Sequence, residues 1–112
     1  MIELRDKLRQ FAAERDWDQF HTPKNLASAL SVEAAELLEH FQWLTAEQST
    51  RLPAEQKEKV RDEMADVLLY LIRLADKLDV DLLEAAAQKI DKNALKYPAG
   101  QVRGSMKKYS DY

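Results

Sequence analysis

Two short acidic pairs, each inside an apolar stretch rich in helix-forming residues, constrain this chain more than any other feature. Glu33 and Glu36 stand three residues apart, and Glu63 and Asp66 repeat that spacing thirty residues further along the chain. On an α-helix of about 3.6 residues per turn, this spacing places both side chains of a pair on one face. The fold must therefore either expose both pairs to water or give them a shared partner.

Four carboxylates that face inward would need a cation. Two like charges about 4 Å apart repel by roughly 4 kcal/mol at an effective dielectric constant near 20. Glu33 and Glu36 have no lysine or arginine nearby in the sequence, and Asp66 directly precedes an apolar run, so their burial without a partner would be costly. Oxygen ligands favour Mg²⁺, with Mn²⁺ as the alternative, whereas zinc prefers nitrogen and sulfur. The plain alternative is a solvated acidic face, which is common on helices.

A di-iron centre is a weaker interpretation of the same carboxylates. Helical di-iron proteins carry Glu-x-x-His elements on two helices, and this sequence has none. His40 follows Glu36 by four residues and has no counterpart near Asp66. Carboxylate-bound magnesium usually keeps positions open for water and substrate phosphates, which points to phosphate chemistry.

The composition favours a single all-α domain. The 112 residues are 33% charged and 46% hydrophobic, and they include only two glycines and three prolines. This balance is typical of a compact chain rich in helix formers. We expect a four-helix bundle-type domain over residues 1–100 and a basic tail over residues 101–112 that is mobile or ordered by a ligand. The expected helices span residues 2–16, 23–44, 53–78 and 81–97.

The third of these helices is apolar on nearly all sides beyond Val67. One neighbouring helix within the chain cannot cover such a surface, so we expect a subunit interface there.

Several functional classes are excluded or disfavoured. The chain has no cysteine, which rules out disulfides and thiolate catalysis. A formal net charge of −3 gives no general attraction for DNA or RNA. The first residues show no secretory signal, and the apolar run from Val67 to Ile72 is too short to cross a bilayer. We therefore expect a cytoplasmic protein.

Basic and aromatic side chains provide candidates for binding a nucleotide, since the sequence lacks a phosphate-binding glycine loop. Phosphates would be held by side chains near the end of the fourth helix and in the tail. These candidates are Lys89, Asn93, Lys96, Tyr97, Arg103, Lys107 and Lys108. A base could stack on Trp17, Trp43 or Tyr70, although each of these is also a good core residue. The alternative for Lys96 is capping of the helix C-terminus.

The same residues form a pattern that resembles the MazG-like all-α nucleotide pyrophosphohydrolases, closest to the dCTP pyrophosphatase group. The resemblance extends over nearly the whole chain. Besides the two acidic pairs, the matching motifs are FAAERDW (residues 11–17), HTPKNL (21–26), FQW (41–43), DVLLY (66–70), KIDKN (89–93), KYP (96–98), RGS (103–105) and KY (108–109).

The resemblance implies a role for each group of candidates. Magnesium ligands would be Glu33, Glu36, Glu63 and Asp66. The base and sugar pocket would include Trp17, His21, Trp43 and Tyr70. Phosphate or sugar contacts would come from Lys89, Asn93, Tyr97 and Arg103, in part from a neighbouring subunit. His40 stands where an apolar residue is expected and receives no role.

The implied activity is hydrolysis of a nucleoside triphosphate to the monophosphate and pyrophosphate, with dCTP or a modified dCTP as substrate. The family usually forms dimers or dimers of dimers (tetramers). In a metal-assisted hydrolysis, Glu36 or Glu63 would accept the proton of the attacking water. Two alternatives remain open: the same chemistry on dUTP or another non-canonical nucleotide, and a non-catalytic helical oligomerisation module.

Overall fold

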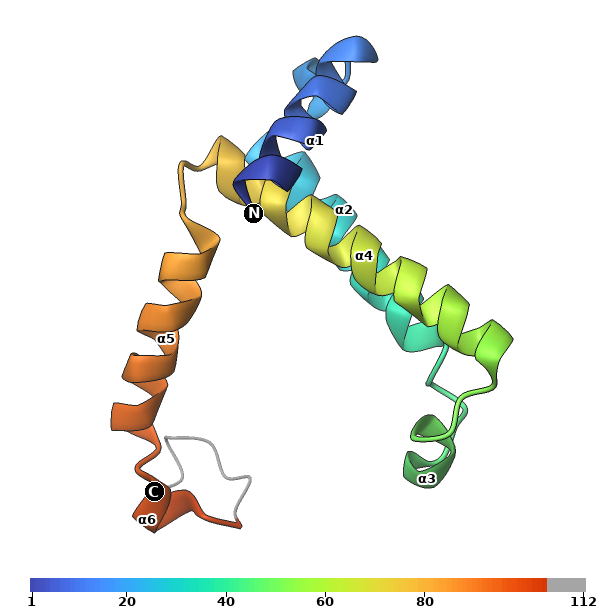
Figure 1. The fold of residues 1–112 in the computed structure, drawn as a ribbon, viewed down its shortest axis with the longest axis vertical. Coiled ribbons are helices and arrows are strands. Elements are labelled where there is room, and N and C mark those ends of the chain that lie inside the picture. The colour runs from blue at the N-terminus through green and yellow to red at the C-terminus, as the bar shows by residue number, and fades with distance from the viewer. Residues whose placement is uncertain (105–112) are drawn as a thin grey trace. The chain divides into compact units, whose positions relative to one another are not determined.

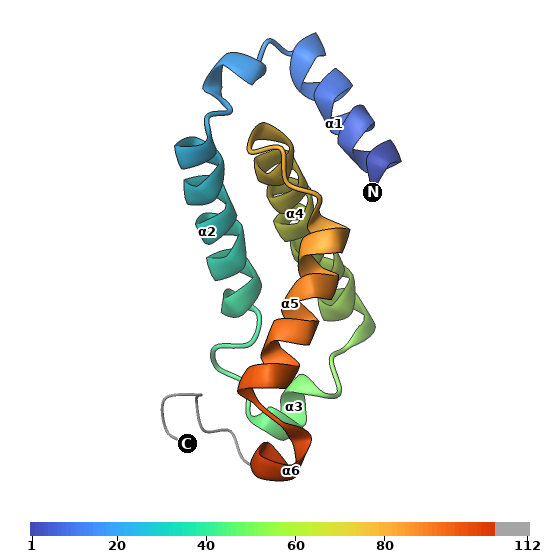
Figure 2. The ribbon, with the colours of Figure 1, turned by 90° about the vertical axis from the view of Figure 1, so that its left-hand side faces the viewer.

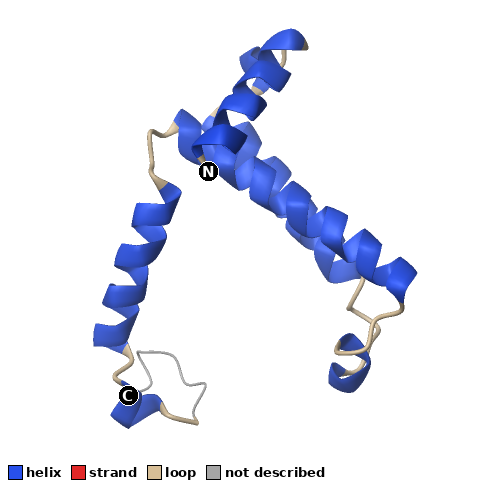
Figure 3. Ribbon diagram, in the orientation of Figure 1, coloured by secondary structure: helices blue, strands red, loops and turns tan. Residues whose placement is uncertain are grey.

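The computed structural model describes residues 1–104, and within them every regular element is a helix (Figures 1 and 3). This confirms the predicted all-α class. In chain order the elements are α1 (Ile2–Glu14), the short 3₁₀ helix η1 (Asp18–Phe20), α2 (Pro23–Glu39), α3 (Ala46–Ser49), α4 (Ala54–Lys77), α5 (Leu82–Lys96) and α6 (Ala99–Val102).

The chain divides into two compact units after Val80. The first unit contains α1 to α4, and the second begins at Asp81 and contains α5 and α6. The predicted boundary at residue 100 stays a prediction, and α6 extends across it. Among residues 1–104, no helix combines the length and apolarity that crossing a membrane would require.

The centre of the first unit is the pair α2 and α4, which lie side by side and run in opposite directions (Figure 2). Helix α2 begins at Pro23 because Thr22 caps it, accepting a hydrogen bond from the backbone N–H of Asn25 at 3.2 Å. Leu26 is 1% exposed, and Val60 and Ile72 on α4 are also buried. Helix α1 packs on α4 and buries Ala12.

Helix α2 ends at Glu39, five residues before the predicted end at Leu44. Beyond it the chain turns tightly: the backbone N–H of Phe41 donates to the carbonyl of Leu38 at 2.8 Å. Helix α3 was not predicted. Thr45 and Gln48 form a capping box there, with the Thr45 hydroxyl accepting from the Gln48 backbone and the Gln48 side chain accepting from the Thr45 backbone.

A charged network joins η1, α1 and α4 at the end of α4 opposite to α3 (Figure 1). Arg73 is only 6% exposed, and its guanidinium donates to Asp18, to His21 Nδ1 at 3.2 Å and to Asp76 Oδ2 at 3.4 Å. Arg9 also donates to Asp76 Oδ2, at 2.7 Å. A buried guanidinium is tolerated when its charge and donors are satisfied in this way.

The network predicts that Asp76→Asn destabilises the protein. The hydrogen bond from Arg9 is the largest of the effects that hold the Asp76 pKa below its ordinary value of 3.8. A depressed carboxyl pKa contributes stability that is present above the unfolded pKa and lost as the pH falls through the folded pKa. We expect the variant to lose about 1–3 kcal/mol of unfolding free energy at pH 7.

Urea unfolding of both proteins between pH 7 and pH 2.5 checks this. The difference between them should shrink as the pH falls below about 3.8, because the unfolded carboxyl then takes up a proton that the native carboxyl, with its lowered pKa, still resists. A difference that is constant over the whole range would show that the charge of Asp76 is unimportant.

Candidate metal and nucleotide site

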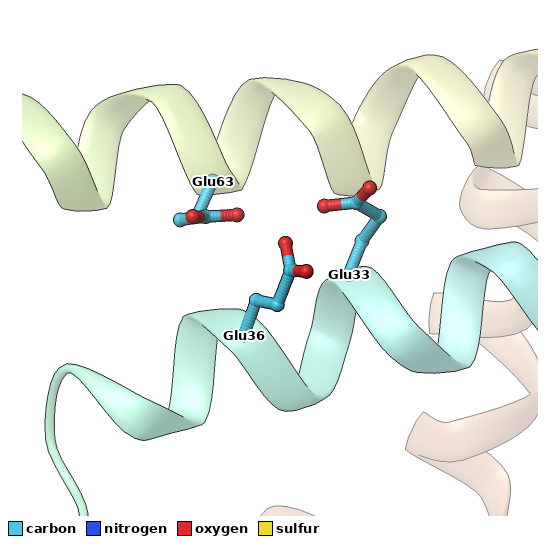
Figure 4. Close-up of side chains that lie close together, drawn as sticks. All are labelled: Glu33, Glu36 and Glu63. Atoms are coloured by element: carbon cyan, nitrogen blue, oxygen red, sulfur yellow. The ribbon is translucent and has the colours of Figure 1, made fainter.

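Three glutamates meet between α2 and α4 (Figure 4). Glu33 and Glu36 project from α2, and Glu63 projects from α4 toward them. Each of the three offers a carboxylate oxygen, and these oxygens all lie within 4.8 Å of one another. The antiparallel helix pair thus brings the first acidic pair and one member of the second together, as the i, i+3 spacing led us to expect.

The carboxylates in this cluster lack compensation. Glu33 Oε2 and Glu63 Oε2 are buried and have no hydrogen-bond partner among the described residues. Burial raises the pKa of Glu33 to about 7, helped by a hydrogen bond with Glu36 and by the negative charges of Glu36, Asp66 and Glu63. Buried carboxylate oxygens without donors are rare, and they fit a site that binds a cation.

Asp66 lies near this cluster without belonging to it in the present geometry. It follows Glu63 by three residues on α4 and is exposed. Its charge nevertheless contributes to the raised pKa of Glu33. Its predicted role as a fourth ligand stays a prediction.

The donor set suits the ion that the sequence predicted. All three converging groups are carboxylates, which Mg²⁺ and Mn²⁺ accept as ligands. Within residues 1–104, the one basic group in ion-pair range of the three is His40, whose Nε2 lies 3.8 Å from Glu63 Oε1. No lysine or arginine among the described residues forms an ion pair with the cluster and so takes the place of a metal ion.

His40 is a residue to which sequence reasoning gave no role. It is the C-cap of α2, and its Nδ1 lies 2.6 Å from Nε2 of Gln56 on α4. The signal that could have identified it is its position four residues after Glu36, on the same face of the helix.

A pocket of about 620 Å³ opens beside His40. It lies between the end of α2, the segment around α3 and the start of α4, and its lining includes His40, Trp43, Arg51 and Gln56. Trp43 is 87% exposed, so its ring is available to a ligand. The volume falls in the range of small-molecule sites.

The other predicted pocket residues of the first unit lie elsewhere. Trp17 and His21 precede the first residue of α2, whereas Trp43 follows its last. The 17 residues of α2 span about 25 Å. Trp17 contacts Phe11 and His21, with ring centroids 5.7 Å and 6.5 Å apart. One chain therefore does not bring Trp17 and His21 together with Trp43. Tyr70 is half-buried on α4, one turn beyond Asp66.

The predicted phosphate-binding residues belong to the second unit. Lys89 and Asn93 are exposed and four residues apart on α5, so they share a face. Tyr97 is half-buried at the end of α5, and Arg103 is exposed after α6. Their part in the site stays a prediction. Lys107 and Lys108 lie outside the described residues.

Known proteins are similar to this chain in sequence and in fold. A sequence model of the MazG-like family matches residues 28–112. The dCTP pyrophosphatase 1 of Mus musculus is 43% identical over 111 residues, covering 97% of this chain and 65% of that protein. The Homo sapiens dCTP pyrophosphatase 1 is 42% identical over 111 residues, with coverage of 97% and 65%. The chain thus spans about two thirds of the length of these relatives.

A solved structure supports the same relationship. The crystal structure of a pyrophosphatase from Archaeoglobus fulgidus matches with a TM-score of 0.83 and 45% sequence identity, covering 88% of this chain and 92% of that chain. The all-helical architecture is therefore shared with that pyrophosphatase.

The raised pKa of Glu33 predicts how stability and metal binding depend on pH. The pKa of about 7 lies above the ordinary value of 4.5, so the folded metal-free protein retains a proton that the unfolded chain has released. Its stability should therefore fall as the pH rises from 4.5 to 7, and Glu33→Gln should reduce this slope. Because ligands must be deprotonated, Mg²⁺ should stabilise the wild type more at pH 8 than at pH 5.5.

Thermal unfolding with and without Mg²⁺ measures both effects. Glu55→Gln, an exposed glutamate in the first turn of α4, is the control and should behave like the wild type. Equal stabilisation by Mg²⁺ at both pH values would contradict the prediction.

Proposed function

Because the chain belongs to the MazG-like family, we propose that it is a divalent-metal-dependent nucleoside triphosphate pyrophosphohydrolase. The observation that carries the proposal is the glutamate cluster between α2 and α4, in which two buried oxygens have no hydrogen-bond partner within residues 1–104. His40 lies between this cluster and a pocket of about 620 Å³: it is 3.8 Å from Glu63 and lines the pocket together with the exposed Trp43. A cation site beside an aromatic pocket suits a ligand with phosphates at one end and a base at the other.

The proposed substrate is dCTP or a modified dCTP, cleaved to the monophosphate and pyrophosphate in the cytoplasm. Two relatives named dCTP pyrophosphatase 1, at 43% and 42% identity, support this choice. The alternative is the same reaction on dUTP or another non-canonical nucleotide, because base discrimination depends on a few buried hydrogen bonds.

The carboxylates of the chain would have two roles at the phosphates, metal binding and proton acceptance. Glu33, Glu36, Glu63 and Asp66 would hold Mg²⁺, or Mn²⁺ as the alternative. When bound, the ion offsets phosphate charge and favours attack by water. Glu36 or Glu63 would accept the proton of the attacking water. Glu33, with a pKa of about 7, would lose its proton when the ion binds.

The substrate pocket would be completed between subunits. Trp43 lies at one end of α2, and Trp17 and His21 lie at the other, so one nucleotide that contacts all three needs two copies of the chain. The phosphate contacts from Lys89, Asn93, Tyr97 and Arg103 and the packing of Tyr70 belong to the same proposal. Exposed apolar residues on α4 and α5 support a homodimer or homotetramer: Met64 (58%), Leu68 (41%), Leu83 (63%), Ile90 (68%) and Leu95 (83%).

Pyrophosphate release from a panel of nucleotides tests the proposed function. With Mg²⁺ present, we expect release from dCTP or a modified dCTP, and dUTP and the four canonical ribonucleotides report selectivity. Glu63→Gln should lower kcat by at least about 100-fold because a proposed metal ligand is lost, whereas Glu55→Gln should have no effect. No release from any nucleotide would favour the non-catalytic oligomerisation module instead.

Replacing the exposed tryptophan tests the pocket separately from the metal. Trp43→Ala should raise KM about tenfold, since stacking of one base contributes roughly 1–3 kcal/mol. The affinity of the nucleotide-free protein for Mg²⁺, measured by calorimetry, should stay within about twofold of the wild type. Equal losses of metal and nucleotide affinity would identify Trp43 as structural.

A further inference from the structure

The side chains of Gln56, His40 and Glu63 form a chain that leads into the glutamate cluster. Gln56 Nε2 lies 2.6 Å from His40 Nδ1, and His40 Nε2 lies 3.8 Å from Glu63 Oε1. The side chains of His40 and Glu63 are only 19% and 22% exposed. His40 therefore occupies the space between the end of α2 and the metal-binding face of α4.

The orientation of the Gln56 amide indicates which ring nitrogen of a neutral His40 carries the hydrogen. An amide nitrogen can only donate, so Nδ1 of His40 must accept, and the neutral ring then keeps its hydrogen on Nε2. This places an N–H on the side of Glu63. The opposite arrangement, with the amide oxygen of Gln56 toward Nδ1, would direct the lone pair of Nε2 at a carboxylate, and the two would repel.

The two carboxylate oxygens of Glu63 have different surroundings. Oε1 lies on the His40 side, whereas Oε2 is buried and has no hydrogen-bond partner in the part of the chain that the structure describes. The His40 nitrogens are not part of the group of ligand atoms that lie within 4.8 Å of one another. The position of His40 is thus that of a group that acts on a ligand, and not of a ligand itself.

We propose that His40, held by Gln56, is a positioning residue that anchors Glu63 through Oε1 and leaves Oε2 to bind the metal ion. This rests on the proposed function and deepens it. Three neighbouring carboxylates repel one another, and a free glutamate side chain would turn away from the cluster when no ion is present. The Nε2 atom of His40 lies 3.8 Å from Glu63 Oε1, beyond hydrogen-bond length, so its N–H opposes that movement by electrostatic attraction and prepares the site for the ion.

Metal affinity of the nucleotide-free protein tests this role without reference to activity. Binding of Mn²⁺ alone should weaken about 10–100-fold in His40→Leu, the usual effect of removing an outer-shell partner. His40→Gln, which keeps an N–H donor, should recover most of the affinity. Lys59→Gln, at an exposed position of α4, is the control. Wild-type affinity in His40→Leu, or equal losses in His40→Leu and His40→Gln, would overturn the proposal.

A second measurement on the wild type remains decisive if His40→Leu does not fold. The ¹⁵N shifts of the His40 ring, recorded at a pH where the ring is neutral, should show the hydrogen on Nε2. In Gln56→Leu this preference should weaken, and Mn²⁺ affinity should fall with it. A hydrogen on Nδ1 in the wild type would overturn the proposal. If no nucleotide is hydrolysed, the proposed function fails, but these metal and tautomer measurements still decide the role of His40.

Discussion

The mutual repulsion of three half-buried carboxylates is the constraint on which the rest of the first unit depends. Carboxylate oxygens of Glu33, Glu36 and Glu63 are brought within 4.8 Å of one another, although no lysine or arginine among the described residues forms an ion pair with them. Such an arrangement persists only if the helices that carry the groups are held together elsewhere. Buried apolar residues along the α2–α4 pair, among them Leu26, Val60 and Ile72, supply that support.

The charged network at the other end of α4 differs from the glutamate cluster because its carboxylates are paired with basic side chains. Asp18 and Asp76 are paired with Lys77, Arg9 and Arg73, and their pKa values are lowered, chiefly by hydrogen bonds from Lys77 and Arg9 respectively. Glu33 has no such basic partner among residues 1–104, and burial raises its pKa to about 7. Arg73 and Glu63 are ten residues apart on α4, about 15 Å along its axis. One helix therefore carries aspartate groups that are compensated by basic side chains and a glutamate cluster that is not, and the second has the character of a cation site.

Local signals made much of this fold predictable. Thr22 before Pro23 and Asp81 before Leu82 set the starts of α2 and α5 as their side chains predict, with Asp81 accepting from the Glu84 backbone at 3.1 Å. The end of α2 was placed five residues too late because apolar periodicity continues through Phe41 and Leu44. The turn that replaces it involves His40, whose partner Gln56 lies sixteen residues away, and no local pattern reports such a contact.

The candidate site, like the fold, was predictable where it depends on spacing along one helix and not where it depends on how helices pack. The i, i+3 spacing fixes Glu33 and Glu36 on one face, so their meeting with Glu63 followed once α2 and α4 were expected to pack. Helical spacing could not tell that Asp66 would be exposed while Glu63 is half-buried, because this depends on the rotation of α4 against α2. Nor could it tell that Trp17 and Trp43 lie beyond opposite ends of one helix, since a motif gives the order of residues and not their separation in space.

The two histidines of the chain complete the argument about the metal site. His21 Nδ1 accepts a hydrogen bond from Arg73, and burial together with the nearby positive charges of Arg73 and Lys77 lowers its pKa. His40 Nδ1 faces the amide nitrogen of Gln56. In both rings the Nδ1 lone pair is therefore engaged by a donor, and the neutral ring presents an N–H at Nε2. Among the described residues, the ligand atoms that converge within 4.8 Å of one another all come from carboxylates and none from a ring nitrogen, which favours Mg²⁺ or Mn²⁺ over metals that select imidazole.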